Sequence, residues 1–541
     1  MRMPEASAEY NFSKKQVMMG VVAIFAVYGT MSYFVQSLTV ARPKMTAELN
    51  GMPLYALAVS IPALVAAFTT LIYGKLSDIY GRRKMLLVAV IFSLISAILC
   101  AIAPTFKFLI AATVVGSFGS GAMMPLVYAA IGDLFPPEKR GKWIGLLQVP
   151  VGFFSLCGPL LGGWFVDHAS WRYLYLIALP LLLVCLVTIP IGVPSLANRE
   201  VKRKIDYIGC LLIAVASSGA IIGLSFAGKY GWSSSKTLIT LGIAVAAGIV
   251  FLLVERIVEE PIVAPSLLRN RSFMTVSIAT LLSFLGQMGM MMYFPMFLQG
   301  VQKISTTYNG LIMIPSNILM AIISVPVGFL LTRSKRFKWM YVVGVGLVTL
   351  DLFGIMLLSS ETHVAWDVVV SILAGIGMGA LPVINTMVVQ NAVPKRMLGV
   401  AMGAFFFCFS IGMAIAPAIL DSAKASGYEK TLSASLPKGL DKIADSRTIQ
   451  SLCDEKVLLN ESARSRLEKA FDGKGTEGNA LYTRTYYAIR DAMQSGIRRV
   501  FLVGAIAMLL AFLLICTIPE NSIVEDPRKM EQEPAETAMA N

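Results

Sequence analysis

The sequence predicts an all-α membrane protein with fourteen membrane-spanning helices, and three observations lead to that prediction. Of the 541 residues, 56% are hydrophobic and only 14% are charged, which excludes an ordinary soluble domain. The apolar residues fall into blocks of about 20, the length that a helix needs to cross about 30 Å of hydrocarbon. The basic residues alternate from one loop to the next, as the positive-inside rule requires of a multispanning chain.

The expected helices follow one another along most of the chain. Several contain Gly and Pro, which spanning helices tolerate when neighbouring helices satisfy the freed backbone groups. Their expected ranges are 17–40, 53–74, 84–103, 107–132, 141–166, 171–193, 206–228, 236–256, 272–300, 306–331, 339–359, 364–390, 397–420 and 498–518.

This spacing predicts two bundles of six helices with two additional helices between them. The first bundle is expected in 17–193, and the second in 272–420 together with helix 14 at 498–518. The remaining expected parts are a cytoplasmic N-terminus (1–16), linkers with two extra helices (194–271), an extracytoplasmic loop (421–497) and a cytoplasmic tail (519–541).

The net charge of +14 indicates orientation in a membrane, not a nucleic-acid partner. With the N-terminus inside, basic clusters such as Arg82–Lys84 and Arg333–Lys338 fall on one side, and the short loops on the other side carry few basic residues. We therefore expect a multi-pass protein of a bacterial inner (plasma) membrane with both termini in the cytoplasm.

Two stretches of the chain resemble each other, one in each half. DLFPPEKRGKWIGLL leads to SLCGPLLGG in the first half, and QNAVPKRMLGVAMG leads to SIGMAIAPAIL in the second. Both contain a helix end, a proline, a basic pair, a glycine and then a helix with small residues and proline. Repeats of this kind build many secondary transporters, whose substrate site lies between the halves.

The segment 74–84, GKLSDIYGRRK, separates the second and third expected helices. Its glycines permit close helix approach and a tight turn. Its carboxylate can face a helix N-terminus or the nearby guanidinium groups, and Asp133 at the end of the fourth helix is a second partner for them. Such a cluster can close the inner side in one conformation and release it in the other. The predicted conformational gate is Gly74, Asp78, Gly81, Arg82, Arg83 and Asp133.

A second motif, GPLLGG, lies in the fifth expected helix. Glycines on one helix face let another helix approach closely, and a proline frees a carbonyl and bends the helix. Ordinary small-residue packing is the alternative. The motif residues are Gly158, Pro159, Gly162 and Gly163.

Together these motifs resemble the major facilitator superfamily. The pattern GxLxDxxGRRxxxL is similar to its signature loop at every key position. GPLLGG, followed by WRYLYLIALP, resembles the antiporter motif of the 14-helix drug:proton antiporter branch, although Phe154 replaces an upstream glycine. The resemblance covers most of 17–420 and 498–518. It implies a major facilitator fold, efflux of small amphipathic compounds by alternating access, and proton antiport.

The chain departs from the family pattern where proton coupling is expected. Phe34 stands at the acidic position of the first helix, and Thr113 and Gly116 replace an arginine and a glutamine of the fourth. Asp351 remains, about 18 Å along the eleventh helix at 1.5 Å per residue. An intramembrane ionisable residue is a functional hypothesis by default, so Asp351 is the proton-coupling candidate. A buried structural acid and a displaced helix boundary are the alternatives, since this helix is peripheral in the family.

The helices expected to line a central cavity carry polar, uncharged and aromatic groups. A large apolar pocket with few polar groups suits amphipathic molecules, and aromatic faces can hold cations. Arg42 could meet an anionic substrate or a lipid phosphate, and packing is the alternative for the others. The substrate-cavity candidates are Tyr33, Phe34, Gln36, Arg42, Tyr128, Gln148, Gln287, Tyr293, Asn317 and Asn385.

The expected partners are a small-molecule substrate, the lipid bilayer, protons and, as a further option, a periplasmic adaptor. No nucleophile–base pair, metal-ligand spacing or phosphate loop appears, so no enzyme activity, cofactor or metal is expected, and no nucleic acid. Residues 421–497 suggest a helical cap over the exit side, with substrate gating or partner docking as alternatives. Two other functions stay open. One is an exporter or facilitator of a specific metabolite, such as an anionic siderophore or lipid, with unusual or no proton coupling. The other is a non-transporting receptor or partner subunit.

Overall fold

The computed structural model describes residues 13–51, 54–194, 206–258, 261–263, 265–334, 337–437, 458, 465, 468–469 and 475–518. Within these ranges the secondary structure is helical and contains no strand. Fourteen helical stretches are long and apolar enough to cross a membrane. The predicted fold class and the predicted number of spanning helices are therefore confirmed.

Seven helices form the first half of the protein. The fifth expected span is two helices, because the helix is interrupted at Leu147, where α5 ends and α6 begins. In order, the helices are α1 (Lys14–Glu48), α2 (Tyr55–Tyr80), α3 (Arg82–Ala101), α4 (Phe106–Leu134), α5 (Pro137–Leu146), α6 (Gln148–His168) and α7 (Arg172–Gly192).

The second half contains one irregular span. The ninth expected helix is interrupted by a π-helical turn, η3, which ends two residues before Pro295. The missing N–H of Pro295 removes one backbone donor from the helix. The elements are α10 (Pro265–Arg269), α11 (Arg271–Met288), η3 (Gly289–Tyr293), α12 (Phe294–Gly300), α13 (Thr306–Ser334), α14 (Lys338–Met356), α15 (Val364–Asn391), η4 (Lys395–Met397), α16 (Leu398–Ser435) and α20 (Gly475–Cys516).

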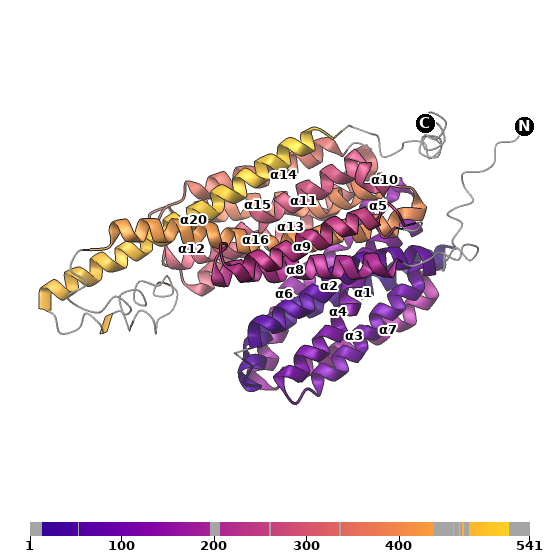
Figure 1. The fold of residues 1–541 in the computed structure, drawn as a ribbon, viewed down its shortest axis with the longest axis horizontal. Helices are drawn as coiled ribbons and strands as arrows, with labels where there is room; N and C mark the ends of the chain where they lie inside the picture. The colour runs from indigo at the N-terminus through magenta and orange to yellow at the C-terminus, as the bar shows by residue number, and fades with distance from the viewer. Residues whose placement is uncertain are drawn as a thin grey trace, which may run out of the picture.

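The two halves lie side by side and diverge along their length (Figure 1). They meet at the end where α1 begins and α20 ends, and they spread apart toward the other end. We call the first the basic end, because Lys14, Arg82 and Arg140 lie at the helix starts there. The other is called the opposite end.

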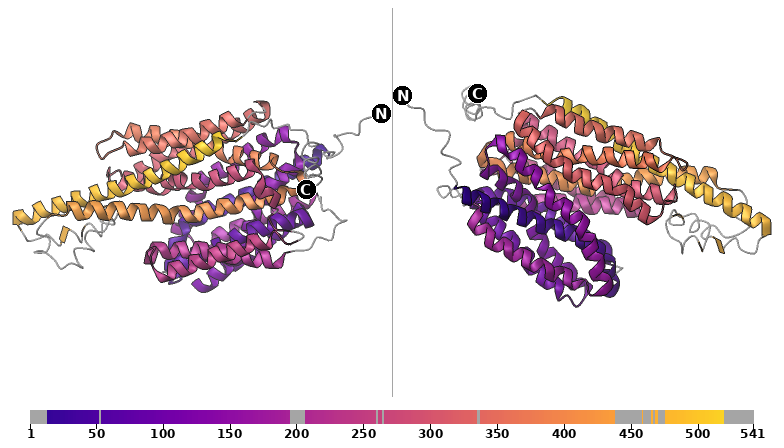
Figure 2. Two further views of the ribbon diagram at one scale, coloured as in Figure 1. Left: turned by 45° about the horizontal axis from the view of Figure 1, so that its top comes forward. Right: turned by 180° about the vertical axis from the view of Figure 1, so that it is seen from behind.

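Helices α16 and α20 protrude beyond the other helices at the opposite end as an antiparallel pair (Figure 2). The thirteenth helix does not end near residue 420 as expected but continues to Ser435. Glycines permit this pairing, since a Cβ on Gly427 would lie 2.9 Å from the Cα of Gly496. The last expected span, 498–518, is the second part of α20, which already begins at Gly475.

The two extra helices, α8 (Tyr207–Tyr230) and α9 (Ser235–Val254), form a hairpin between the halves (Figure 1). α8 packs against α2 of the first half and against α16 of the second. The indole Nε1 of Trp232, in the turn of the hairpin, donates a hydrogen bond to Ser422 Oγ at 2.9 Å. The hairpin therefore contacts both sides of the boundary between the halves.

Candidate gate between the two halves

Glycines bring α2 and α16 together at the basic end. A Cβ on Gly74 would lie 2.6 Å from the carbonyl oxygen of Gly399 and 2.9 Å from the Cα of Gly403. Real side chains do not fit at such distances, so the two helix backbones touch at this crossing. The contact joins the first half to the second, which makes it a point where the halves must separate if the basic end opens.

The carboxylate of Asp78 lies on the N-terminus of α16. Asp78 Oδ1 accepts a hydrogen bond from the backbone N–H of Gly399 at 3.0 Å, and Oδ2 accepts one from Val400 at 2.8 Å. These amides belong to the first turn of a helix, where backbone donors lack intrahelical partners and the helix dipole is positive. An anion is therefore stabilised here, and the bond exists only while α2 and α16 are in contact.

Arg82 connects this carboxylate to a second one. Its Nη2 lies 2.5 Å from Asp78 Oδ1, and its Nε donates to Asp133 Oδ2 at 3.0 Å. A further hydrogen bond reaches Ser77 Oγ. All three charged side chains are at least nine-tenths buried. Removing one partner of a buried ion pair costs about 3–5 kcal/mol because the other charge is left uncompensated, so Arg82 holds the cluster together.

The turn between α2 and α3 sets the position of Arg82. Gly81 adopts φ 88° and ψ 147°, a conformation that L side chains rarely adopt. This lets α3 begin at once, with Arg82 directed into the cluster. Arg83 is half-buried and makes no hydrogen bond or ion pair with any described residue. The structure thus brings together five of the six predicted gate residues and leaves Arg83 outside.

A second crossing joins the halves through α5 and α13. A Cβ on Gly141 would lie 2.8 Å from the carbonyl oxygen of Gly328, and one on Gly145 would lie 2.4 Å from that of Ser324. Arg140, just before this crossing, donates from Nη2 to Gly132 O at 2.9 Å and from Nε to Phe135 O at 3.0 Å, which caps the end of α4. The basic end is therefore closed at two places.

A neutral polar network lies between these crossings. Tyr128 Oη is 3.2 Å from Tyr28 Oη and accepts a hydrogen bond from Gln148 Nε2 at 3.2 Å. Gln390 of α15 donates to the carbonyl oxygen of Tyr128 at 2.8 Å, across the boundary between the halves. Gln390 was not predicted from the sequence. The internal repeat could have identified it. Gln390 stands four residues before Pro394, and in the other copy Asp133 stands four residues before Pro137.

The other predicted cavity residues divide by burial. Tyr33 and Tyr293 are buried, and their hydroxyls donate to Leu174 O at 2.7 Å and to Asp421 Oδ1 at 2.6 Å. Asn385 is buried beside Thr280, with an Nδ2···Oγ1 distance of 3.1 Å. These three are held by the helices around them. Phe34, Gln36 and Gln287 are half-buried, whereas Arg42 and Asn317 are exposed.

The GPLLGG motif packs mainly against α1. A Cβ on Gly158 would lie 2.7 Å from Gln36 Cβ, and one on Gly162 would lie 2.6 Å from Ser37 O. A Cβ on Gly163 would meet nothing within 4 Å, and Pro159 is exposed within α6. Close helix approach therefore accounts for Gly158 and Gly162 but not for Gly163.

Asp351 is completely buried in α14. Neither of its carboxylate oxygens has a hydrogen-bond partner among the described residues. α14 packs against α15 and α20 and lies on the side of the second half away from the first (Figure 1). Asp351 is therefore distant from both crossings, and a charge at this position would have nothing described to stabilise it.

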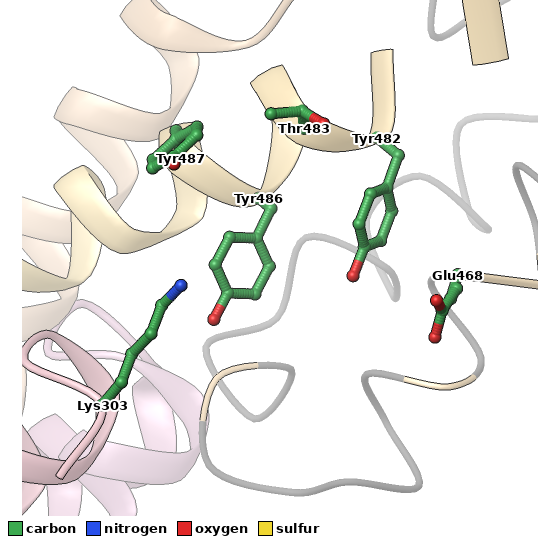
Figure 3. A pocket seen from close by; sticks show the side chains of 6 residues that line it. All are labelled: Lys303, Glu468, Tyr482, Thr483, Tyr486 and Tyr487. Atoms are coloured by element: carbon green, nitrogen blue, oxygen red, sulfur yellow. The ribbon is translucent and has the colours of Figure 1, made fainter. Parts of the chain in front are cut away.

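A pocket of about 370 Å³ lies at the opposite end, on the protruding part of α20 (Figure 3). Lys303 and Glu468 lie on two sides of it, with the rings of Tyr482 and Tyr486 between them. The Lys303 ammonium is 4.8 Å from the centre of the Tyr486 ring, within the range of a cation–π contact. Thr483 and Tyr487 complete the lining.

Two bundles of spanning helices, joined at one end and diverging at the other, are the architecture of many secondary transporters. The model of the Major Facilitator Superfamily matches residues 21–417. The chain belongs to this superfamily, as its motifs predicted, and it is a membrane transporter and not an enzyme.

Several relatives carry the names of resistance or transport proteins. Multidrug resistance protein 3 of Bacillus subtilis is 30% identical over 449 residues, covering 82% of this chain and 84% of its own length. The multidrug transporter protein MdtP of the same organism is 29% identical over 375 residues and covers 69% of each chain. Among solved structures, the human organic anion transporter MFSD10 (TETRAN) superposes with a TM-score of 0.59 at 13% identity. It covers 92% of this chain and 99% of its own length, which supports the fold alone.

Proposed function

We propose that this protein exports small amphipathic compounds across a bacterial inner membrane by alternating access, with the basic end in the cytoplasm. The observation that carries the proposal is the closed basic end, where Asp78 binds the N-terminus of α16 and Arg82 joins it to Asp133. An exporter needs such a conformation to release substrate outward. The positive-inside distribution of basic residues supports the orientation, with both termini cytoplasmic.

The substrate class follows from the relatives and from the helix faces. The word multidrug recurs in their names, and large apolar side chains are exposed on helices that belong to both halves, including Phe153 of α6 and Met291 of η3. Methionine adapts to ligands of different shape. Among the predicted cavity residues, the partly exposed Phe34, Gln36, Gln287 and Asn317 are the ones we propose for substrate contact.

Proton antiport is the coupling that the family resemblance implies, and protons are the second proposed partner. Asp351 remains the candidate that the sequence offers for it. Its complete burial on a peripheral helix supports the structural alternative instead. The protruding pair α16–α20 is the surface that a periplasmic adaptor could reach.

Flux measurements in proteoliposomes test this function. Ethidium efflux should be accelerated at least fivefold by an imposed pH gradient, relative to vesicles that lack the protein. Flux restricted to one metabolite and indifferent to pH would instead favour the exporter of a specific metabolite. No flux of any compound, together with a stable partner in a pull-down, would favour a receptor and contradict the proposal.

A further inference from the structure

At the basic end, a buried carboxylate stabilises the chain segment that connects the α8–α9 hairpin to the second half. Glu255 follows α9 directly and is 3% exposed. Its Oε1 accepts a hydrogen bond from the backbone N–H of Ile262, and its Oε2 accepts one from Val263, both at 3.1 Å. Glu255 therefore holds the connection that leaves the hairpin and continues to α10 and the second half.

A second carboxylate, Asp206, lies beside this connection. Asp206 caps the N-terminus of α8, where its Oδ1 accepts from Gly209 N at 2.8 Å. Its Oδ2 is buried and has no hydrogen-bond partner among the described residues. A Cβ on Gly209 would lie 2.2 Å from this oxygen and 3.1 Å from Ile262 Cδ1. The unpartnered oxygen thus lies in the same small space as the residues that Glu255 holds.

The groups around Glu255 determine how readily it binds a proton. The pKa of Glu255 is raised to about 7, chiefly by burial and to a smaller extent by the Asp206 carboxylate. The backbone N–H donors of Val263 and Ile262 and the Lys75 ammonium of α2 act in the other direction. The thiol of Cys210 in α8 is the other titratable group close to the pair.

Lys75 places this pair next to the gate. It belongs to α2 and stands three residues before Asp78, whose carboxylate binds the N-terminus of α16. α8 itself packs against both α2 and α16. If the attachment of the hairpin changes, α8 therefore transmits the change to both α2 and α16, the two helices of the first crossing.

We propose that Glu255 and Asp206 form a cytosolic proton-binding site that fastens the α8–α9 hairpin across the α2–α16 crossing. The proposal rests on the proposed function for its orientation. A proton taken from the cytosol by Glu255 removes one of two neighbouring negative charges, and the Glu255 oxygen without the proton still accepts a backbone N–H. When the proton leaves, two buried carboxylates are charged with the Lys75 ammonium as the nearby cation, and their repulsion loosens the hairpin.

The direction of the pH effect follows from the raised pKa. The fastened arrangement binds the proton more tightly than a free glutamate does, so it is favoured at low pH and lost as the pH rises through about 7. With a pKa of about 7, Glu255 is mostly protonated at pH 6 and mostly ionised at pH 8. Alkaline cytosol should therefore make the basic end easier to open.

Distances between spin labels test this proposal without transport. In a variant without native cysteines, labels at Tyr80 in α2 and Ile208 in α8 lie on exposed positions of the two elements. Double electron–electron resonance in nanodiscs should show a longer-distance population that grows at least twofold between pH 6 and pH 8, with a midpoint near 7. Glu255→Gln, which is neutral at every pH, should abolish this change.

Two further variants keep the test decisive. Glu138→Gln removes an exposed carboxylate at the same end and should leave the titration unchanged. Asp206→Asn removes the neighbouring negative charge and should move the midpoint below that of the unmodified chain, even if Glu255→Gln fails to fold. An unchanged distance distribution from pH 6 to pH 8, or an unchanged midpoint in Asp206→Asn, would overturn the proposal. Ethidium flux by the same preparation tests the proposed function separately.

Discussion

Asp133 in α4 and Asp351 in α14 are both buried aspartates of spanning helices, but their surroundings differ. Asp133 receives a hydrogen bond from the Arg82 guanidinium at 3.0 Å and belongs to a cluster that reaches the other half. Asp351 has no hydrogen-bond partner in the described ranges and lies on a peripheral helix. Burial alone therefore does not distinguish these two positions. Membership in an ion cluster that reaches the other half does.

The largest expected effect is from Arg82→Ala, which gives Asp133 surroundings like those of Asp351. Two buried carboxylates would lose their cation, and we expect the free energy of unfolding to fall by about 3–5 kcal/mol. Ethidium transport should fall at least tenfold, because the contact between α2 and α16 depends on the same cluster. Thermal unfolding in detergent and proteoliposome flux measure the two effects.

Arg83→Ala is the matched control for Arg82→Ala. Arg83 is adjacent but has no partner in the part of the chain that the structure describes, so its removal should change stability by no more than about 0.5 kcal/mol. Adding Asp133→Asn to Arg82→Ala should recover part of the lost stability, since one uncompensated charge disappears. Wild-type stability and transport in Arg82→Ala would show that the cluster does not hold the basic end closed.

How much of this cluster could be predicted depended on distance along the chain. Asp78 and Arg82 are one helical turn apart, and the resemblance to a known loop identified both. The partners that Asp78 reaches, the amides of Gly399 and Val400, lie more than 300 residues away, and spacing within the sequence carries no signal for them. Gln390 was missed for the same reason, although the internal repeat aligns it with Asp133.

The cavity and the antiporter motif show a second limit of the sequence. Tyr33 was expected to line the cavity because it lies on a cavity-lining helix, but its hydroxyl faces Leu174 inside the first half. Gly163 belongs to the same motif as Gly158 and Gly162 yet meets no neighbouring helix. A sequence identifies which helix a residue belongs to, whereas the face that the residue occupies depends on how that helix is rotated in the bundle.

A smaller effect is expected from Asp351→Asn, which changes the buried acid that has no partner among the described residues. The substitution keeps the shape of a neutral carboxyl group and removes its ability to ionise. Since no described group stabilises a charge there, the free energy of unfolding should change by less than about 1 kcal/mol. Ethidium transport driven by a pH gradient should stay within twofold of the unmodified protein.

Asp351→Val provides the second variant for this site. It removes two buried oxygens without partners, and replacement of such groups by apolar atoms of similar shape is often neutral or stabilising. A folded Asp351→Asn protein that transports ethidium but no longer responds to the pH gradient would assign proton coupling to Asp351. Asp133 would then be an acid of the gate and Asp351 an acid that couples transport to protons.

The smallest expected effect concerns Glu48, an acid with a partner but without burial. Arg172 Nη1 lies 2.8 Å from Glu48 Oε1, and the Trp171 indole donates to Oε2 at 2.9 Å. The hydrogen bond from Arg172 lowers the pKa of Glu48 below its usual value. The stabilisation is therefore present above the usual value of about 4.5 and is lost as the pH falls through the lowered pKa.

Glu48→Gln should therefore reduce stability slightly at pH 7 and have progressively less effect toward pH 4. Both charged side chains of the pair are about a third or more exposed, so solvent screening limits the loss to about 0.5 kcal/mol, and added salt should reduce it further. Thermal unfolding at pH 7 and pH 4 measures this difference, with Glu361→Gln at another exposed position as the control. If Glu48→Gln lowered the free energy of unfolding as much as Arg82→Ala does, the ion pairs alone, without burial, would account for the stability of the gate cluster.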